Sequence, residues 1–216
     1  KNSELAEHLR KFKGRVVFSG DRVVDQNYDA AIFNDLGSAP ATLEASKMAD
    51  FYGSAPGYTV EIADAVQAYV QAEMKGTPTY VCLPPEARPA WWAKDPEISK
   101  MKRPVCRMLR ALYGHPDAGT YWEEKCNEHV RKVGFTPAGP EWPSVYWHPD
   151  LKLMLVVYVD DFKLAGPKDK VKQGWALLRK GLDIEAEKAI DENGIVYLGC
   201  RQKSYPIKLP DGRLAT

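Results

Sequence analysis

Apolar and polar positions along the chain predict both helices and strands. Alternation with a period of two, and short continuous apolar runs, indicate strands, whereas apolar residues three or four apart indicate helices. The predicted strands cover residues 13–18, 58–63, 79–83, 144–147, 151–159, 162–165 and 195–203. The predicted helices cover residues 2–12, 41–52, 65–74, 121–133 and 168–182. Helices and hairpins are mixed in this order, which favours an α+β fold, with helices layered on an antiparallel sheet, over a doubly wound parallel sheet.

The most informative segment is an apolar strand that runs directly into two aspartates. Residues 153–159 are all apolar, Asp160 and Asp161 follow, and a second apolar strand begins at Phe162. Neighbouring carboxylates repel each other, and holding them between two buried strands is costly unless something compensates. A solvent-exposed turn is one explanation, because Asp is common in turns, although the usual two-residue hairpin turn has Gly or Asn beside the Asp. Bound divalent cations are the other explanation, and the segment alone leaves both open.

A third carboxylate favours bound divalent cations as the explanation for the acidic pair. Asp64 follows the predicted strand 58–63, and two strands that end in carboxylates can lie side by side and converge on one point. Phosphoryl transfer uses metal ions roughly 3.5–4 Å apart to clamp the attacking and leaving oxygens. Mg²⁺ is satisfied by a few carboxylates together with waters and substrate phosphates. Asp64, Asp160 and Asp161 are therefore candidate ligands of a two-metal site.

Composition narrows the classes of function. With 216 residues, of which 44% are hydrophobic and 27% charged, the chain can form a packed core, which argues against wholesale disorder. The net charge of +1 shows no overall basic excess, so any phosphate-binding surface must be local. Four cysteines without a CxxC spacing favour reduced thiols in an intracellular protein. The apolar runs are too short to span a bilayer, no signal peptide is evident, and the first residue, Lys1, suggests a fragment or a processed product.

Six short motifs occur in one order between residues 12 and 203. They are KGRVV at 13–17, DAVQAYV at 64–70, YVCLPP at 80–85, RMLRALYG at 107–114, YVDD at 158–161 and YLGC at 197–200. Together they resemble the KARLV, DVxxAFL, YVxxPP, RLxKALYG, YVDD and FLG segments of the reverse transcriptase domain of Copia-type LTR retrotransposon polyproteins. Each match is short, and the specificity comes from the order and spacing of all six.

The resemblance implies a polymerase palm, an antiparallel sheet backed by helices, joined to a fingers subdomain. On that basis residues 1–57 form the N-terminal part of the fingers and 58–84 the palm with the first metal-binding Asp. The further implied parts are a fingers/palm insertion at 85–120, the palm with the YVDD hairpin at 121–203, and the start of a truncated thumb or connection at 204–216.

The implied activity is that of an RNA-directed DNA polymerase, with two Mg²⁺ ions, replaceable by Mn²⁺, bound by Asp64, Asp160 and Asp161. The resemblance places Lys13, Arg15, Tyr69 and Asp117 at the incoming nucleotide, and Tyr158, Tyr197, Leu198 and Gly199 at the primer or template. A solvated basic strand for Lys13 and Arg15, and core packing for Tyr69, are the plainer alternatives. The implied partners are an RNA or DNA template with its primer, deoxynucleoside triphosphates, and the RNase H and integrase domains of the polyprotein. The implied location is the cytoplasm, including virus-like particles, with no membrane contact.

One stretch departs from the family. The family continues LYGLKQAPRAW, whereas residues 112–122 read LYGHPDAGTYW, so that Asp117 replaces the Gln that helps to seat the nucleotide. The family's Lys and Arg in this segment are also absent here, so the chain has one acid in place of two cations and an amide. This exchange disfavours the binding of a polyanion nearby. Either the nucleotide is seated differently, or the domain is a decayed or domesticated form that binds nucleic acid without polymerising. A third interpretation, an unrelated α+β domain with an acidic turn, requires all six matches to be coincidental.

Overall fold

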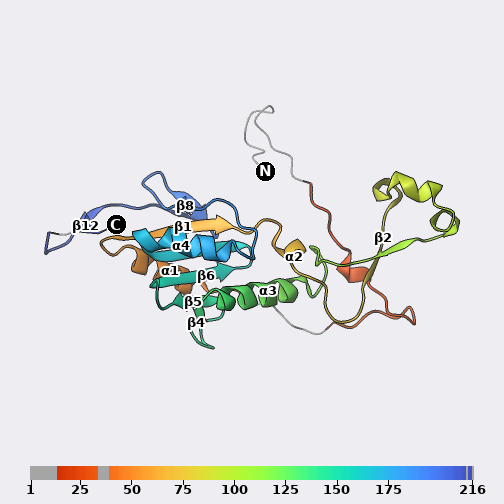
Figure 1. Cartoon of the computed structure of the whole chain (residues 1–216), viewed down its shortest axis with the longest axis horizontal. Coiled ribbons are helices and arrows are strands. Elements are labelled where there is room, and N and C mark those ends of the chain that lie inside the picture. The colour runs from red at the N-terminus through yellow and green to blue at the C-terminus, as the bar shows by residue number, and fades with distance from the viewer. Residues whose placement is uncertain (1–13, 34–38, 213, 216) are drawn as a thin grey trace, which may run out of the picture.

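A six-stranded antiparallel sheet forms the centre of the molecule (Figure 1). The structure is a computed structural model, and it describes residues 14–33, 39–212 and 214–215. In spatial order the strands are β4 (Thr136–Pro137), β5 (Val145–His148), β6 (Leu153–Tyr158), β7 (Asp161–Pro167), β1 (Tyr58–Asp64) and β8 (Lys188–Ala189). Each strand is antiparallel to its neighbours. The apolar run before Asp160 is thus a central strand, which explains why it is apolar on both faces.

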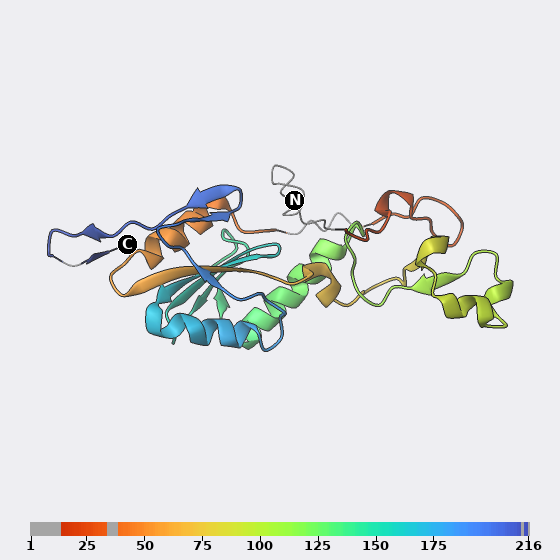
Figure 2. The same cartoon turned by 90° about the horizontal axis from the view of Figure 1, so that it is seen from above.

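Helices cover both faces of this sheet (Figure 2). On one face lie α3 (Ala118–Lys132) and α4 (Lys168–Leu178), whose Trp122 and Trp175 join the main core with Phe162 and Leu164 of β7. On the other face lies α1 (Leu43–Gly53), with Thr42 as its N-cap. The buried residues that α1 brings to the sheet are all small, which allows the helix backbone to approach closely; they are Ala45, Ser46, Ala49 and Gly53. We call this three-layer unit the body, and it confirms the predicted α+β arrangement.

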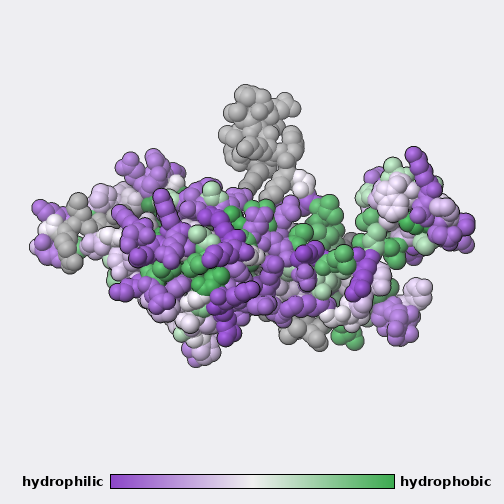
Figure 3. Space-filling model, viewed as in Figure 1, coloured by the Kyte–Doolittle hydropathy of each residue, from purple (hydrophilic) through white to green (hydrophobic). Residues whose placement is uncertain are grey.

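An extension, here called the arm, projects from one end of the body (Figures 1 and 2). It contains the antiparallel pair β2 (Tyr80–Cys82) and β3 (Val105–Arg107). Between these strands lie three short 3-10 helices, η3 (Pro85–Ala87), η4 (Ala90–Lys94) and η5 (Ile98–Lys100). Residues 14–33, which include η2 (Gly20–Arg22), run beside the base of the arm. Hydrophobic surface is exposed where the arm joins the body (Figure 3).

Two small hairpins follow the body toward the C-terminus. The first consists of β9 (Ile195–Tyr197) and β10 (Cys200–Gln202), and the second of β11 (Ile207–Lys208) and β12 (Leu214–Ala215). The first replaces the single strand predicted for residues 195–203, because Leu198 and Gly199 both have positive φ values, 48° and 77°, and reverse the chain. The second extends from the end of the body opposite the arm (Figure 1).

The helix predicted after Asp64 is wrong in length, because only α2 (Ala68–Gln71) forms. The backbone of the surrounding residues is used by other segments instead. Ala65 N donates to Asp160 O, Met74 N donates to Leu109 O, and Gln67 has a positive φ of 49° that interrupts any helix. Helix α4 likewise ends at Leu178, short of the predicted residue 182.

The elements predicted for the N-terminal residues differ in outcome from one another. The strand predicted for residues 13–18 is not formed by its described part, since Phe18 N bonds to the loop carbonyl of Tyr113 and Val16 and Val17 are exposed. The helix predicted for residues 2–12 lies outside the described residues, as does Lys13. Helix α1, which falls within the range 1–57 assigned to the fingers, packs on the sheet of the body. Within the described residues no helix is long and apolar enough to cross a membrane.

Candidate active site

Strand pairing brings the predicted carboxylates together. In the register of β1 and β7, Asp64 lies directly opposite Asp161, and in the register of β6 and β7, Tyr158 lies opposite Asp161. Asp160 occupies the turn between β6 and β7, and its carbonyl accepts a hydrogen bond of 2.7 Å from Ala65 N. The backbone therefore ties the end of β1 to the turn. All three aspartates lie at the end of the sheet that faces the arm (Figure 1).

The three carboxylates form a concentration of negative charge. The pKa of Asp161 is raised from 3.8 to about 6, chiefly by burial, and the charges of Asp160 and Asp64 and a hydrogen bond with Asp64 contribute to the same rise. A carboxyl whose pKa is raised by burial and by neighbouring carboxylates gives up its proton to solvent more readily when a cation binds beside it, because the cation offsets the negative charge. The chemistry of this oxygen-rich set therefore fits Mg²⁺ or Mn²⁺.

The aspartates alone do not make a complete metal site. Within the part of the chain that the structure describes, no group of three His, Cys, Asp or Glu side chains is arranged to hold a metal ion. Asp64 and Asp161 form a hydrogen-bonded pair, and Asp160 is a charged neighbour. Waters and substrate phosphates would supply the remaining oxygens, as is usual for Mg²⁺.

Replacing Asp161 with Asn should stabilise the protein at neutral pH when no divalent cation is present. The pKa of Asp161 rises from 3.8 to about 6 on folding, so the folded state loses stability as the pH rises through this interval. Asn keeps the hydrogen-bonding shape without the charge. Since the side chain is only half-buried, screening limits the expected gain to about 1 kcal/mol. Urea unfolding in EDTA should show this gain in full at pH 8 and only about half of it at pH 5, which lies between the two pKa values. An equal gain at both pH values would contradict the charge argument.

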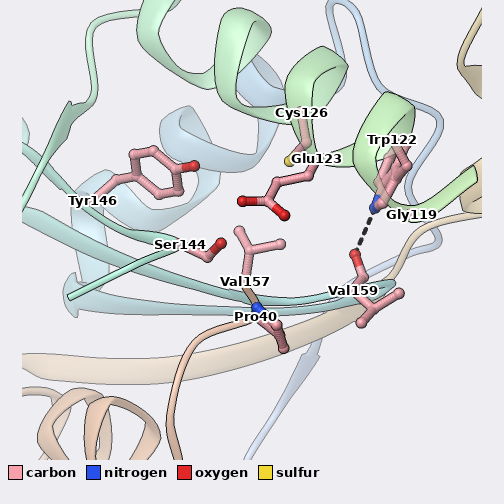
Figure 4. A pocket seen from close by; sticks show the side chains of 9 residues that line it. All are labelled: Pro40, Gly119, Trp122, Glu123, Cys126, Ser144, Tyr146, Val157 and Val159. Carbon is pink, nitrogen blue, oxygen red and sulfur yellow. Dashed lines mark hydrogen bonds between the residues drawn. The ribbon is translucent and has the colours of Figure 1, made fainter. Parts of the chain in front are cut away.

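The turn that carries Asp160 has a strained backbone. Val159 has a φ of 56°, a value that β-branched residues rarely adopt, and such strain costs of order 1–3 kcal/mol. The carbonyl of Val159 accepts a hydrogen bond of 2.7 Å from Nε1 of the buried Trp122 (Figure 4). Figure 4 shows this bond at the edge of a hollow between α3 and the sheet, lined by apolar groups such as Val157. Helix α3 therefore holds the turn in its strained form.

An aromatic pair borders the acidic turn on the side of the arm. The rings of Tyr69 and Tyr113 are 4.5 Å apart between centroids, and the guanidinium of Arg15 lies 5.6 Å from the centroid of Tyr113. Burial is the main cause that raises the pKa of both tyrosines, and the charge of Asp160 raises both further. Two predicted nucleotide contacts, Arg15 and Tyr69, are thus gathered beside Asp160.

The departing stretch 115–120 is part of the packing of this region. The buried ring of His115 lies 5.3 Å from Phe18 and 5.5 Å from Phe33, so it joins residues 14–33 to the start of α3. Asp117 is the N-cap residue of α3, and its Oδ2 accepts a hydrogen bond of 3.3 Å from the hydroxyl of Tyr121. The unusual residues therefore have structural partners, and Asp117 stays a predicted nucleotide contact.

The predicted primer contacts differ in exposure. The side chain of Tyr158 is partly exposed beside Asp161, and Leu198 and Gly199 form the turn of the β9–β10 hairpin. Tyr197 is only 3% exposed, and its ring faces inward over Lys163. The accessible surface of this hairpin therefore includes Gly199 of its turn and the exposed Val196, Cys200 and Arg201.

Two residues of this region carry functions that the sequence pattern does not reveal. Trp122 belongs to a motif, yet its bond to Val159 depends on how α3 crosses the sheet. Lys163 lies within a strand that reads as apolar, and it is completely buried. A charged residue at the centre of an apolar strand is the one signal that indicates a buried partner for Lys163.

Comparisons with known proteins add little to this geometry. The sequence matches no protein-family model and no curated protein. Among solved structures, the chain is similar to a telomerase from Candida albicans, determined in complex with a fragment of telomeric RNA. The two chains are 12% identical with a TM-score of 0.39, over 76% of this chain and 33% of the telomerase chain. The chain thus spans about a third of the length of that protein, and a likeness of this strength carries no argument about function.

Proposed function

We propose that the chain is the polymerase domain of a Copia-type reverse transcriptase, which extends a primer 3′-hydroxyl by attack on the α-phosphate of a deoxynucleoside triphosphate. The observation that carries the proposal is the register that sets Asp64 opposite Asp161, with Asp160 in the adjoining turn. This register supports the proposal because it pairs the ends of two strands, β1 and β7, that are far apart in the sequence and that each carry an aspartate. In this proposal the body is the palm and the arm belongs to the fingers.

Each residue around the turn has a defined task in the proposed reaction. Asp64, Asp160 and Asp161 would hold two Mg²⁺ ions. When bound there, the ions would lower the pKa of the primer hydroxyl and neutralise triphosphate charge. Arg15, exposed above Tyr113, is free to reach phosphate oxygens, which suit its planar group. Tyr69, held against Tyr113, would lie under the sugar of the incoming nucleotide.

The proposal includes the substrates and partners of such a domain. They are a primed RNA or DNA template, deoxynucleoside triphosphates, and the RNase H and integrase domains of the same polyprotein, in cytoplasmic virus-like particles.

Primer extension tests the proposed function. A labelled primer annealed to RNA or to DNA should lengthen when the protein, deoxynucleoside triphosphates and Mg²⁺ or Mn²⁺ are present, and EDTA should stop the reaction. Extension on the RNA template is the expected result. Tight binding of primed template without any extension, with either cation, would replace the polymerase by a second candidate, a domain that binds nucleic acid only. The altered residues 115–120 favour that candidate, because Asp117 adds an acid where the family has an amide.

Replacing Tyr69 with Ala should relax sugar selection. The tyrosine ring is half-buried against Tyr113 and close to Asp160, where it would exclude a 2′-hydroxyl. Loss of that steric contact should raise the incorporation of ribonucleotides relative to deoxynucleotides by about tenfold or more. Single-nucleotide incorporation measures the ratio, and Tyr205→Ala, a change at an exposed tyrosine of the C-terminal segment, is the control. An unchanged ratio would remove Tyr69 from the nucleotide site.

A further inference from the structure

A lysine lies buried in the central sheet, one row of side chains away from the acidic pair. Lys163 of β7 is opposite Ile62 of β1 and Val156 of β6, and its side chain is 0% exposed. Residues two apart on a strand share a face, so Lys163 is on the same face as Asp161, the face that α1 covers. Burial of an ammonium group is costly unless the group is paired and fully hydrogen-bonded. The groups that bond to Lys163 therefore indicate which segments the lysine holds together.

The ammonium group of Lys163 connects three separate segments. Its Nζ donates to Ser46 Oγ and Asp50 Oδ1 of α1, both at 2.8 Å, and to Gln202 Oε1 of β10 at 3.0 Å. Gln202 Nε2 in turn donates to Asp50 Oδ2 at 3.0 Å. All three protons of the ammonium are thus used, and the Lys163, Asp50 and Gln202 side chains form a closed triangle of bonds.

Tyr197 adds a second contact between the lysine and the hairpin. The ammonium of Lys163 lies 4.3 Å from the centroid of the Tyr197 ring, within the range of a cation–π interaction. Burial is the main cause that raises the pKa of Tyr197, and the charges of Asp161, Asp50 and Asp64 contribute further. The hydroxyl is buried, and no described residue bonds to it. The inner side of the hairpin therefore lies close to the acidic pair.

The hairpin has few other means of holding its place. Strands β9 and β10 pair only with each other, and a two-stranded hairpin alone is marginally stable in water. Besides its contacts with Lys163 and the bond from Gln202 to Asp50 of α1, the described hydrogen bonds join this region to the preceding loop, from Ser204 N to Asp191 O and from Arg201 Nη2 to Asn193 O. Neither of these bonds reaches the sheet, whereas the bond from Lys163 does.

We propose that Lys163 is a positioning residue, which fixes the β9–β10 hairpin against the sheet beside Asp64 and Asp161, so that the exposed turn of the hairpin guides the nucleic-acid strand whose end reaches these acids. This inference rests on the proposed polymerase function. An apolar residue at position 163 would fill the same space but would give α1 and the hairpin no common partner. The lysine thus holds a hairpin that has few other contacts in a fixed position beside the site.

Gln202→Ala provides the main test, because it removes the hydrogen bonds that join the hairpin to Lys163 and Asp50 and leaves the Lys163–Asp50 pair and the Tyr197 contact in place. Amide hydrogen exchange of residues 195–202 should quicken by roughly fivefold to tenfold, while the exchange of β6 and β7 stays as in the wild type. The KM for primed template should rise by a similar factor with kcat changed less than about twofold. Gln173→Ala, on the exposed surface of α4, is the matched control and should alter neither quantity.

Lys163→Met is a stronger form of the same test. The exchange rate of residues 195–202 and the KM for primed template should both rise further than in Gln202→Ala. If this variant fails to fold, Gln202→Ala still decides. Unchanged exchange of residues 195–202 in Gln202→Ala would overturn the positioning role, whatever the protein does with nucleic acid. Faster exchange with an unchanged KM, or equal losses in kcat and in folded fraction, would also overturn it. Hydrogen exchange needs no catalysis, so an absence of primer extension by the wild type would count against the proposed function and not against the attachment of the hairpin.

Discussion

Primer extension should be lost when Asp160 and Asp161 are both replaced by Asn, and also when Asp64 alone is replaced by Asn. Both changes remove carboxylate charge from the point where β1 meets β7, and Asn is a poorer ligand for Mg²⁺. We expect the rate to fall by at least about a thousandfold, the scale on which preorganised electrostatic contacts act in catalysis. The fold should persist, because Asn preserves the shape of Asp and relieves repulsion within the cluster. Circular dichroism and thermal unfolding check this part of the prediction.

Asp150→Asn is the matched control for these variants. Asp150 is an exposed residue of the turn between β5 and β6, next to the other end of β6. The same chemical change there should leave the extension rate within about twofold of the wild type, in the range of ordinary surface substitutions. Wild-type extension by the variant with Asn at 160 and 161 would show that these residues do not bind the catalytic ions.

Trp122→Phe should have the second-largest effect on activity. The change keeps an aromatic ring in the core and removes the indole N–H that bonds Val159 O at 2.7 Å. The partly buried carbonyl then lacks its partner, which should lower the free energy of unfolding by about 1–3 kcal/mol. Without this bond the strained turn is free to relax, so Asp160 and Asp161 would leave their places and primer extension should fall by about tenfold or more.

Trp175→Phe separates the two consequences. Trp175 is as deeply buried, and its Nε1 donates to Glu61 Oε2 of β1 at 2.8 Å rather than to the turn. We expect a similar loss of stability from this change but little loss of activity at temperatures where the variant stays folded. If both variants lose activity in proportion to stability, the bond from Trp122 has no specific part in holding the turn.

The sequence predicts the body of the fold well because its core elements are strongly patterned. The apolar run before Asp160 and the alternation that ends at Asp64 identify two strands, and strands that end in acids meet when they pair in antiparallel register. Helices α3 and α4 are predicted from the helical spacing of their apolar residues. These features are local, because each can be recognised from a short stretch of the sequence.

Non-local contacts account for what the sequence does not predict. The segment after Asp64 has helical composition, yet residues 72–74 bond to residues 109–111 from the far side of the arm, and only α2 stays helical. The attachments of Lys163 join residues 46, 50 and 202, which no window of sequence brings together. The positive φ of Val159 likewise follows from the tight turn and from Trp122, not from any preference of valine.

Binding of Mn²⁺, followed by the electron paramagnetic resonance of the free ion, tests whether the three aspartates share a cation, and it requires neither a template nor a thumb. The wild-type protein should bind Mn²⁺, Mg²⁺ should compete, and Asp64→Asn should weaken the affinity by at least about tenfold, as expected for the loss of one charged ligand. Identical titrations of the wild type and Asp64→Asn would show instead that the acid on β1 shares no cation with the acids of the turn.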